Sequence, residues 1–423
     1  MLETVSGNYS HLHLKMDISS QIEQDNFRHL IKDVFWFGLA FPATSRFLAV
    51  YALRVGASAQ EVAWLSALPA LMLLAATTLS RWWSHRYPDA VRASFWSGLG
   101  FRFSFLLPVL TPFFPPEWQP AWLLFSVTLP ALPQGLASVV FLVLLRQAVS
   151  ANRLPALVSQ RTLILNIALI LGTLLLGYWL EIVPFPFNYQ SMFGLAFGLG
   201  LISLWHVSRT KNLVVVSERL EEAIGISPWQ DSAFRAVIVT AFLTHLTWFI
   251  VVPLVPIYLI DHLGASESFV AILIALELLA AALASLALNR FVSLRHYRLV
   301  IAPAMVCASV STAIIALSSN LMLILAAGAI NGAAWTFISL AVYGFFTQRA
   351  PDAQLTAYAA AYNQVIFLAM FVGPLLSSLA LTLCSDILVG LILGAALRFL
   401  AGIALAPHHQ ITRWPRHGVA LKG

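Results

Sequence analysis

Charged side chains inside long apolar runs are the residues of this sequence best suited to chemistry. Arg46 stands in FPATSRFLAVY, residues 41–51, and Glu277 stands in AILIALELLAAALA. A charge at the centre of a membrane helix costs at least about 2.5–3.5 kcal/mol on insertion scales, so each such residue is a functional hypothesis with an expected partner. Arg102 and Arg398 lie in two further apolar runs.

Arg46 shares a helical face with Phe35, Leu39, Pro42 and Ala49. If that face lines a cavity, its guanidinium is a fixed positive charge that can hold a carboxylate or phosphate with two parallel hydrogen bonds. The alternative is that the long side chain extends toward the nearer membrane surface. We expect Arg46 to bind substrate.

Glu277 shares its helical face with Ala280, Ala281 and Ala284, and small residues mark the packed faces of membrane helices. The carboxyl group is therefore expected to point into the protein. Burial disfavours the charged form of a carboxyl group, which suits it to exchange protons. Proton coupling is our expectation for Glu277. The alternatives are a structural ion pair and a permanently neutral acid.

Uncharged polar and aromatic residues form a second set of substrate-binding candidates. His245 and Trp248 are three residues apart, and Asn331 and Trp335 are four apart, so each pair shares a helical face. Gln134 is a further candidate in the fourth apolar run. An aromatic ring beside a polar group suits an organic solute. Ordinary packing and interhelical hydrogen bonding are the alternative for each residue.

The composition indicates a protein that lies in a lipid bilayer. The 423 residues are 60% hydrophobic and 10% charged, with a mean hydropathy of +0.83. Soluble domains carry about 25% charged residues. The P-loop, H-E-x-x-H, CxxC and G-x-S-x-G motifs are all absent from the sequence. We therefore expect no enzyme activity and hence no catalytic residues, and also no metal and no cofactor.

Twelve apolar runs are long enough to cross a bilayer, for which about 20 residues are needed. They lie at 31–53, 60–80, 92–113, 121–145, 156–180, 187–207, 236–260, 267–288, 299–317, 321–347, 355–382 and 386–406. The prediction is an all-α membrane protein in five segments. These are an N-terminal tail (1–28), a six-helix bundle (29–207), a central loop (208–235), a second six-helix bundle (236–406) and a C-terminal tail (407–423).

Nearly all of the 24 Lys and Arg residues fall in the tails or beside alternate loops. The positive-inside rule then places both termini and the central loop in the cytoplasm. The net charge of +6 is explained by this topology, so we expect no nucleic-acid partner.

The two halves of the chain repeat several features. GAS follows the first span at 56–58 and the seventh span at 264–266. SRWWSHR (80–86) corresponds to NRFVSLR (289–295), and Gly172 in the fifth span corresponds to Gly373 in the eleventh. Twelve spans, two parallel halves and a basic turn after the second span resemble the major facilitator superfamily. The signature of that family in this turn, G-x3-D-R/K-x-G-R-R/K, is reduced here to its arginines.

The resemblance implies two bundles that rock around a central site and expose it to each side in turn. It implies that Arg81, Arg86, Arg290 and Arg295 help to close the cytoplasmic gate; their alternative role is simple membrane anchoring. The family's third and twelfth helices are peripheral, which implies structural roles for Arg102 and Arg398.

We therefore expect a monomeric secondary transporter in the plasma (inner) membrane. It would bind a small-molecule substrate and protons, with export slightly preferred over import. The alternative is a membrane scaffold or a pigment- or complex-assembly factor on the same fold.

Overall fold

All regular elements in the described part of the chain are helices. The computed structural model describes residues 3–150, 152–213, 227–291, 297–351, 354–384 and 386–406. The helices of the first half are α1 (Glu3–Ala40), α2 (Pro42–Ser45), α3 (Leu48–Arg54), α4 (Ala59–Arg86), α5 (Ala90–Leu106), η1 (Leu107–Phe113), η2 (Pro116–Trp118), α6 (Gln119–Ala148), α7 (Leu154–Ile182) and α8 (Phe187–Ser208). Those of the second half are α9 (Ser232–Val251), α10 (Leu254–Ile257), η3 (Tyr258–His262), α11 (Glu267–Phe291), α12 (Tyr297–Leu317), α13 (Leu321–Arg349), α14 (Leu355–Cys384) and α15 (Ile387–Leu405).

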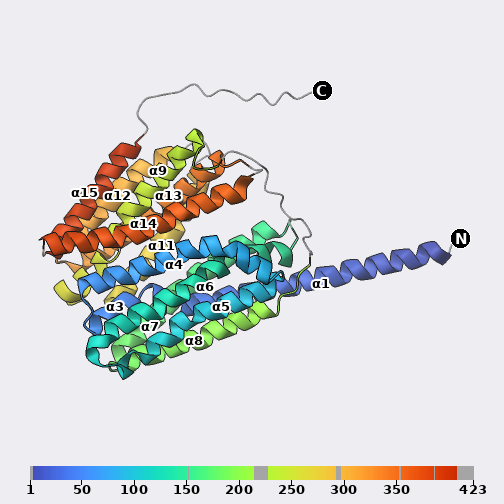
Figure 1. Ribbon diagram of the computed structural model, residues 1–423, viewed down its shortest axis with the longest axis horizontal. Helices are drawn as coiled ribbons and strands as arrows, with labels where there is room; N and C mark the ends of the chain where they lie inside the picture. Colours follow the sequence, from blue (N-terminus) through green and yellow to red (C-terminus); the bar gives the residue numbers. More distant parts are fainter. Residues whose placement is uncertain are drawn as a thin grey trace.

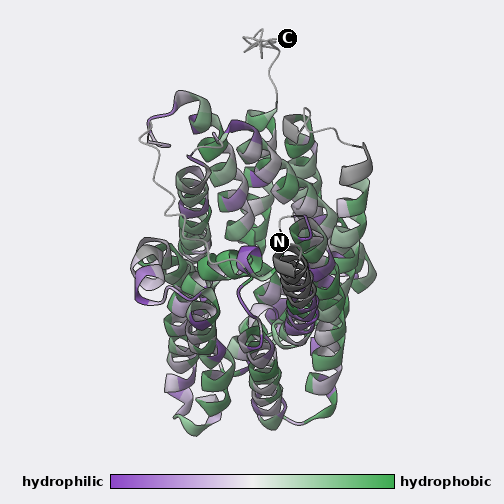
Figure 2. Ribbon diagram, turned by 90° about the vertical axis from the view of Figure 1, so that its right-hand side faces the viewer, coloured by the Kyte–Doolittle hydropathy of each residue, from purple (hydrophilic) through white to green (hydrophobic). Residues whose placement is uncertain are grey.

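These helices form twelve segments that are long and apolar enough to cross a membrane, as the sequence predicts. Hydrophobic residues predominate along the helices (Figure 2). Large apolar side chains such as Leu142, Leu175 and Leu286 are more than half exposed, which suits a surface that faces lipid rather than water. The chain is an integral, multi-pass membrane protein.

The first helix begins well before the apolar run that predicts the first span. Residues 3–28, which were expected to form a tail, are helical and continue into the span, and α1 projects from the bundle (Figure 1). Asn26 is buried, and its amide nitrogen donates to the carbonyls of Ala148 at 2.8 Å and Lys211 at 2.7 Å. The packed part of the helix therefore starts before residue 29.

Many of the spans begin at a polar loop residue whose side chain caps the helix. Ser58 and Glu61 form a reciprocal capping box at the start of α4, in which each side chain binds the other residue's backbone N–H. The side chains of Asp89, Asp231 and Asn320 cap α5, α9 and α13 in the simpler way. These caps satisfy backbone groups that a helix end would otherwise leave unpaired.

The first and seventh spans are both interrupted partway along. The first passes from α1 through the short α2 to α3, and the backbone N–H groups of Arg46 and Phe47 both bond the carbonyl of Pro42. The seventh ends its regular helix at Val251 and resumes at Leu254, after Pro253. Proline lacks the N–H that a helix interior needs, which accounts for a break at these places.

Other prolines leave their helices continuous. Pro69 lies inside α4, and Pro130 and Pro133 lie inside α6. Pro42 and Pro253 lie at helix interruptions, yet the first and seventh segments are still long and apolar enough to cross a membrane. Corresponding interrupted helices in two repeats are a feature of transporter binding sites.

Two glycines at corresponding positions allow close helix packing just before these breaks. A Cβ on Gly172 of α7 would lie 2.7 Å from the carbonyl oxygen of Leu39, and one on Gly373 of α14 would lie 2.8 Å from the Cβ of Phe249. Only glycine permits such an approach without displacing the neighbouring helix. The similarity of the two halves seen in the sequence therefore corresponds to similar packing.

The two halves lie side by side, with the first six spans in blue to green and the last six in yellow to red (Figure 1). α4 packs against α14 and α7 against α11 across the junction. We call the end of the bundle where α1 enters and α15 ends the terminal end, and the opposite end the distal end.

The buried apolar clusters differ between the two ends. At the distal end, Tyr51 and Tyr189 of the first half share a cluster with Ile257 and Ala271 of the second. At the terminal end, a cluster around Leu30 and Leu144 and a second one around Phe234 and Tyr358 are each confined to one half. Apolar packing among the described residues thus joins the halves at the distal end.

Candidate functional site

A cavity of about 350 Å³ lies between the two halves, near the middle of the bundle. Both helix interruptions line it, the first through Ser45 and Arg46 and the seventh through Val252 and Pro253. The remaining walls come from α3, α4, α9, α10, η3, α11, α12, α13 and α15. Its volume falls at the lower end of the range of about 300–1,000 Å³ typical of ligand pockets.

Arg46, Glu277 and Arg398 all line this cavity. Arg46 is half-buried at the interruption of the first span, and within the described residues its guanidinium has no hydrogen bond or ion pair. The charges of Arg46 and Arg398 both act on the Glu277 carboxylate. Arg46 and Glu277, which sequence analysis could not place together, thus face one site.

Arg398 donates hydrogen bonds to neutral acceptors among the described residues. It is 2% exposed, and its Nη1 donates to Thr312 Oγ1 at 2.6 Å while its Nη2 donates to the carbonyl of Trp248 at 3.2 Å. The guanidinium carbon lies 4.2 Å from the centre of the Trp248 ring, in cation–π contact. The resemblance implies a structural role for Arg398; the side chain bonds α9, α12 and α13, and α15 also brings it to the cavity wall.

Asn331 connects the acidic and basic groups. Its Nδ2 donates to Glu277 Oε1 at 3.2 Å, and its Oδ1 accepts from Arg398 Nη1 at 3.4 Å. The next residue, Gly332, packs directly on the backbone of Glu277, so that a Cβ there would collide with it. The close contact of α11 and α13 therefore fixes the carboxylate relative to Asn331 and, through it, to Arg398.

Two tryptophans form an aromatic part of the wall. The ring centres of Trp248 and Trp335 lie 4.5 Å apart, and both residues line the cavity. His245 is buried and packs edge-on against Trp335 at 5.4 Å, and its Nδ1–H donates to the carbonyl of Ala241. His245 thus supports the wall from behind.

The structure brings four of the six predicted substrate-binding residues to the cavity: Arg46, Trp248, Asn331 and Trp335. His245 and Gln134 are not among the lining residues. Gln134 is half-buried in α6 of the first half. Residue spacing predicts which side chains share a helical face, but it does not distinguish a residue that lines the cavity from one that packs behind the cavity wall.

A second buried charge network lies within the first half. Arg102 donates to the carbonyl of Gly200 at 3.2 Å and to Ser203 Oγ at 2.9 Å, and Ser203 donates to Asp33 Oδ1 at 2.7 Å. Asp33 also pairs with Arg161 at 3.0 Å. These bonds tie α1, α5, α7 and α8 together. The network supports the structural role expected for Arg102.

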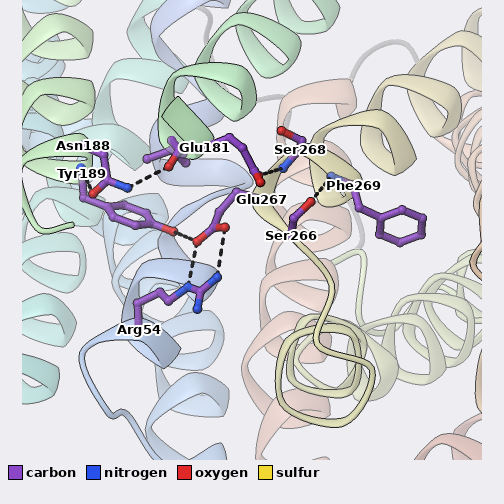
Figure 3. Close-up of polar contacts among 9 residues, drawn as sticks. Arg54, Glu181, Asn188, Tyr189, Ser266, Glu267, Ser268 and Phe269 are labelled. Atoms are coloured by element: carbon purple, nitrogen blue, oxygen red, sulfur yellow. Dashed lines mark hydrogen bonds and ion pairs between the residues drawn. The ribbon is translucent and has the colours of Figure 1, made fainter. Parts of the chain in front are cut away.

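An ion pair joins the two halves at the distal end (Figure 3). Arg54 at the end of α3 bonds Glu267 at the start of α11 through two hydrogen bonds of 2.7 and 3.0 Å. Tyr189 of α8 donates to the same carboxylate at 3.3 Å and stacks on Tyr51 with ring centres 4.4 Å apart. Sequence analysis missed this cluster. The isolated position of Arg54 on the side poor in basic residues was its one signal.

Of the four arginines expected at the cytoplasmic gate, Arg86 has a described side chain. Arg86 is exposed beside Tyr87, with its guanidinium carbon 5.6 Å from the ring centre. Arg295 lies outside the described residues, and the side chains of Arg81 and Arg290 lie outside the described part of the structure. Their gating role stays a prediction.

Comparisons with known proteins agree with the architecture. The family model "Major Facilitator Superfamily" matches residues 34–374. A comparison with curated protein sequences gave no match.

Similar solved structures include a mutant of the nucleoside transporter NupG, with a TM-score of 0.70, 8% identity, and coverage of 90% of this chain and 98% of that one. The xylose transporter XylE from E. coli, in a partially occluded inward-open conformation, has a TM-score of 0.66 and 12% identity, with 90% and 97% covered. The human organic anion transporter MFSD10 (TETRAN) has a TM-score of 0.58 and 12% identity, with 92% and 99% covered. Because these identities are low, the likenesses show the fold. The family match extends over most of the chain, which therefore belongs to the Major Facilitator Superfamily of membrane transporters.

Proposed function

We propose that this protein is a secondary active transporter that moves a small organic solute by alternating access and couples the movement to protons through Glu277. The observation that carries the proposal is the placement of Glu277 in a cavity between the halves, beside two arginines and two tryptophans. A central cavity at the junction of two repeats is where alternating-access proteins bind substrate.

The packing pattern supports a state that is closed at one end. The distal end has apolar clusters and an ion pair that cross between the halves, whereas the clusters at the terminal end each belong to one half. We infer from the distribution of Lys and Arg that the terminal end is cytoplasmic. From this topology we infer an inward-facing state, and we propose that the protein lies in the plasma membrane.

Glu277 is suited to bind and release a proton because its surroundings change with substrate. When the cavity is empty, the carboxylate has the positive charges of Arg46 and Arg398 nearby. A solute that engages either arginine weakens that attraction, which favours protonation of Glu277. Proton binding and solute binding are then thermodynamically linked, and each promotes the other.

The test is solute-driven proton movement in proteoliposomes that contain a pH-sensitive dye. We expect a panel of organic solutes to include compounds that change the internal pH with the wild-type protein, while Glu277→Gln abolishes the change and retains binding. Opposite pH gradients would distinguish export, which we propose as the direction, from import. Unchanged proton movement in Glu277→Gln would overturn the coupling role. Solute binding without any movement would favour a scaffold or assembly factor.

A further inference from the structure

Within the described residues, the guanidinium of Arg46 differs from that of Arg398 in its hydrogen bonding. Thr312, Asn331 and the carbonyls of Thr247, Trp248 and Ala308 all accept hydrogen bonds from Arg398. Arg46 has no such partner within the described residues, although it faces the same cavity. Its planar set of N–H donors is therefore available to a bound solute, with the geometry that suits a carboxylate.

The charges around the cavity give a net value of one positive charge when Glu277 is ionised. The positive groups are Arg46 from the first span and Arg398 from α15, and the negative group is Glu277 from α11. α13, which packs against α11 here, contributes the neutral Asn331 and Trp335. Unbalanced charge in a poorly hydrated interior is costly, so a single negative charge on the solute is the best match. While Glu277 is ionised, a phosphate monoester, which carries about −1.5 to −2 at neutral pH, exceeds that balance.

Most of the remaining lining residues are apolar, and Thr44, Ser45, Ser66 and Thr312 add hydroxyl groups. The tilted pair of Trp248 and Trp335 lies beside aliphatic residues such as Val251, Leu273 and Ile315. One side of Trp248 already carries Arg398 in cation–π contact, so this wall favours a flat or aliphatic body over a second cation.

We propose that the solute is an organic monocarboxylate with an apolar body, whose carboxylate is held by Arg46 and whose body lies against Trp248 and Trp335. This inference rests on the proposed transport function and names the chemical class of its substrate. Glu277 opposes the anion while it is ionised and ceases to oppose it when it is protonated or neutralised.

The experiment compares three head groups on the same body, by calorimetric or fluorescence titration of the full-length protein in detergent at neutral pH. The probes are 3-phenylpropionate, 3-phenylpropionamide and 3-phenylpropylamine, with octanoate, octanamide and octylamine as an aliphatic set. We expect a carboxylate to bind at least about tenfold more tightly than the matching amide, because a charged hydrogen-bonded pair is formed. The amine should bind most weakly.

The variants separate the contributions of the two charged residues. Arg46→Ala should reduce carboxylate affinity at least about tenfold and amide affinity much less, because the amide loses only a neutral acceptor's hydrogen bond; retained amide binding also shows that the cavity is intact. Arg46→Lys should give an intermediate loss, because lysine keeps the charge without the bidentate geometry. Glu277→Gln should raise carboxylate affinity and leave amide affinity unchanged.

Three outcomes would overturn the inference: an amide or amine that binds as tightly as its carboxylate, carboxylate binding that survives Arg46→Ala, or no carboxylate binding at all. In the first two cases the compounds that do bind can still be tested for flux. The transport proposal would then stand with a different substrate class in the first case, and with a carboxylate held by a group other than Arg46 in the second. If the transport proposal itself is wrong, solutes will bind to the protein but will not move across the membrane of the proteoliposomes.

Discussion

Loss of the distal ion pair should shift the protein from the distal-closed state toward a distal-open state. Arg54 and Glu267 come from opposite halves and form two hydrogen bonds, and their side chains are 43% and 10% exposed. A contact made in only one of two conformations biases the equilibrium by its own free energy. Arg54→Ala removes this contact and leaves the Glu267 carboxylate with Tyr189.

The magnitude follows from the geometry and burial. Exposed ion pairs contribute about 0.2–1 kcal/mol, whereas hydrogen bonds to charged groups contribute about 1.5–3 kcal/mol. The pair is bidentate but half open to solvent on the Arg54 side, so after that discount we expect about 1–2 kcal/mol. The ratio of distal-open to distal-closed molecules should then rise about 5- to 30-fold.

The assay is a spin-label distance measurement between Glu117→Cys and Ser319→Cys, which are exposed positions in distal loops of the two halves. Cys307 and Cys384 are both exposed and would first be replaced by alanine. Arg54→Ala should increase the long-distance population. Arg92→Ala is the matched control, because its ion pair with Asp89 lies within one half and is largely exposed. A distance distribution in Arg54→Ala that equals the wild type would refute the reasoning.

Three further predictions concern stability. Asp33→Ala should destabilise the protein by about 3–5 kcal/mol, because it removes the buried partner of Arg161 and an acceptor for Ser203. The control is Asp25→Ala, which affects an exposed ion pair and should change stability by less than about 0.5 kcal/mol. The melting temperatures of the two variants would be compared. Gly332→Ala should lower the melting temperature by forcing α13 away from the Glu277 backbone, at a cost of about 1–3 kcal/mol. Gly194→Ala, whose added methyl group meets open space, should be neutral or slightly stabilising. Equal effects of the two substitutions would contradict the close packing of Gly332. Burial alone would raise the pKa of Asp231, but hydrogen bonds from Tyr358 and from the N–H groups of Ala233 and Phe234, together with the charge of Arg349, lower it below its ordinary value. The carboxylate therefore stabilises the fold above the ordinary Asp pKa of about 3.9, and this contribution is lost as the pH falls through the lower folded-state pKa. Asp231→Asn should thus lower the melting temperature at neutral pH and lose that difference in acid, and a difference that grows in acid would contradict it.

The twelve spans could be predicted because they depend on local properties of the chain. A run of about 20 apolar residues is costly to place anywhere except in a bilayer, and loop charges report its orientation. The breaks could not be predicted in the same way. Pro42 and Pro69 look alike in the sequence, yet Pro42 lies at an interruption and Pro69 inside a continuous helix, because neighbouring helices decide which arrangement packs.

The site could be predicted in part, for a related reason. Arg46 and Glu277 are recognisable singly because a charge is rare in an apolar run. Which charges face one another depends on how helices from distant parts of the chain rotate and pack. Arg398 was expected to have only a structural role, yet it also lines the cavity, and the contact of Arg54 with Glu267 joins residues 213 positions apart. Spacing within a helix contains no information about such pairs.

Movement of the two halves around the cavity is the central claim, and cross-linking them tests it most directly. Arg54→Cys and Glu267→Cys, in a background without Cys307 and Cys384, place two thiols on opposite halves at the distal end, where a short bifunctional thiol reagent can join them. The measurement is counterflow in proteoliposomes of a radiolabelled solute that the protein binds, before cross-linking, after it, and after cleavage of the linker. We predict that cross-linked protein retains solute binding, loses counterflow, and regains counterflow when the linker is cleaved. Counterflow that continues through fully cross-linked protein would contradict the account.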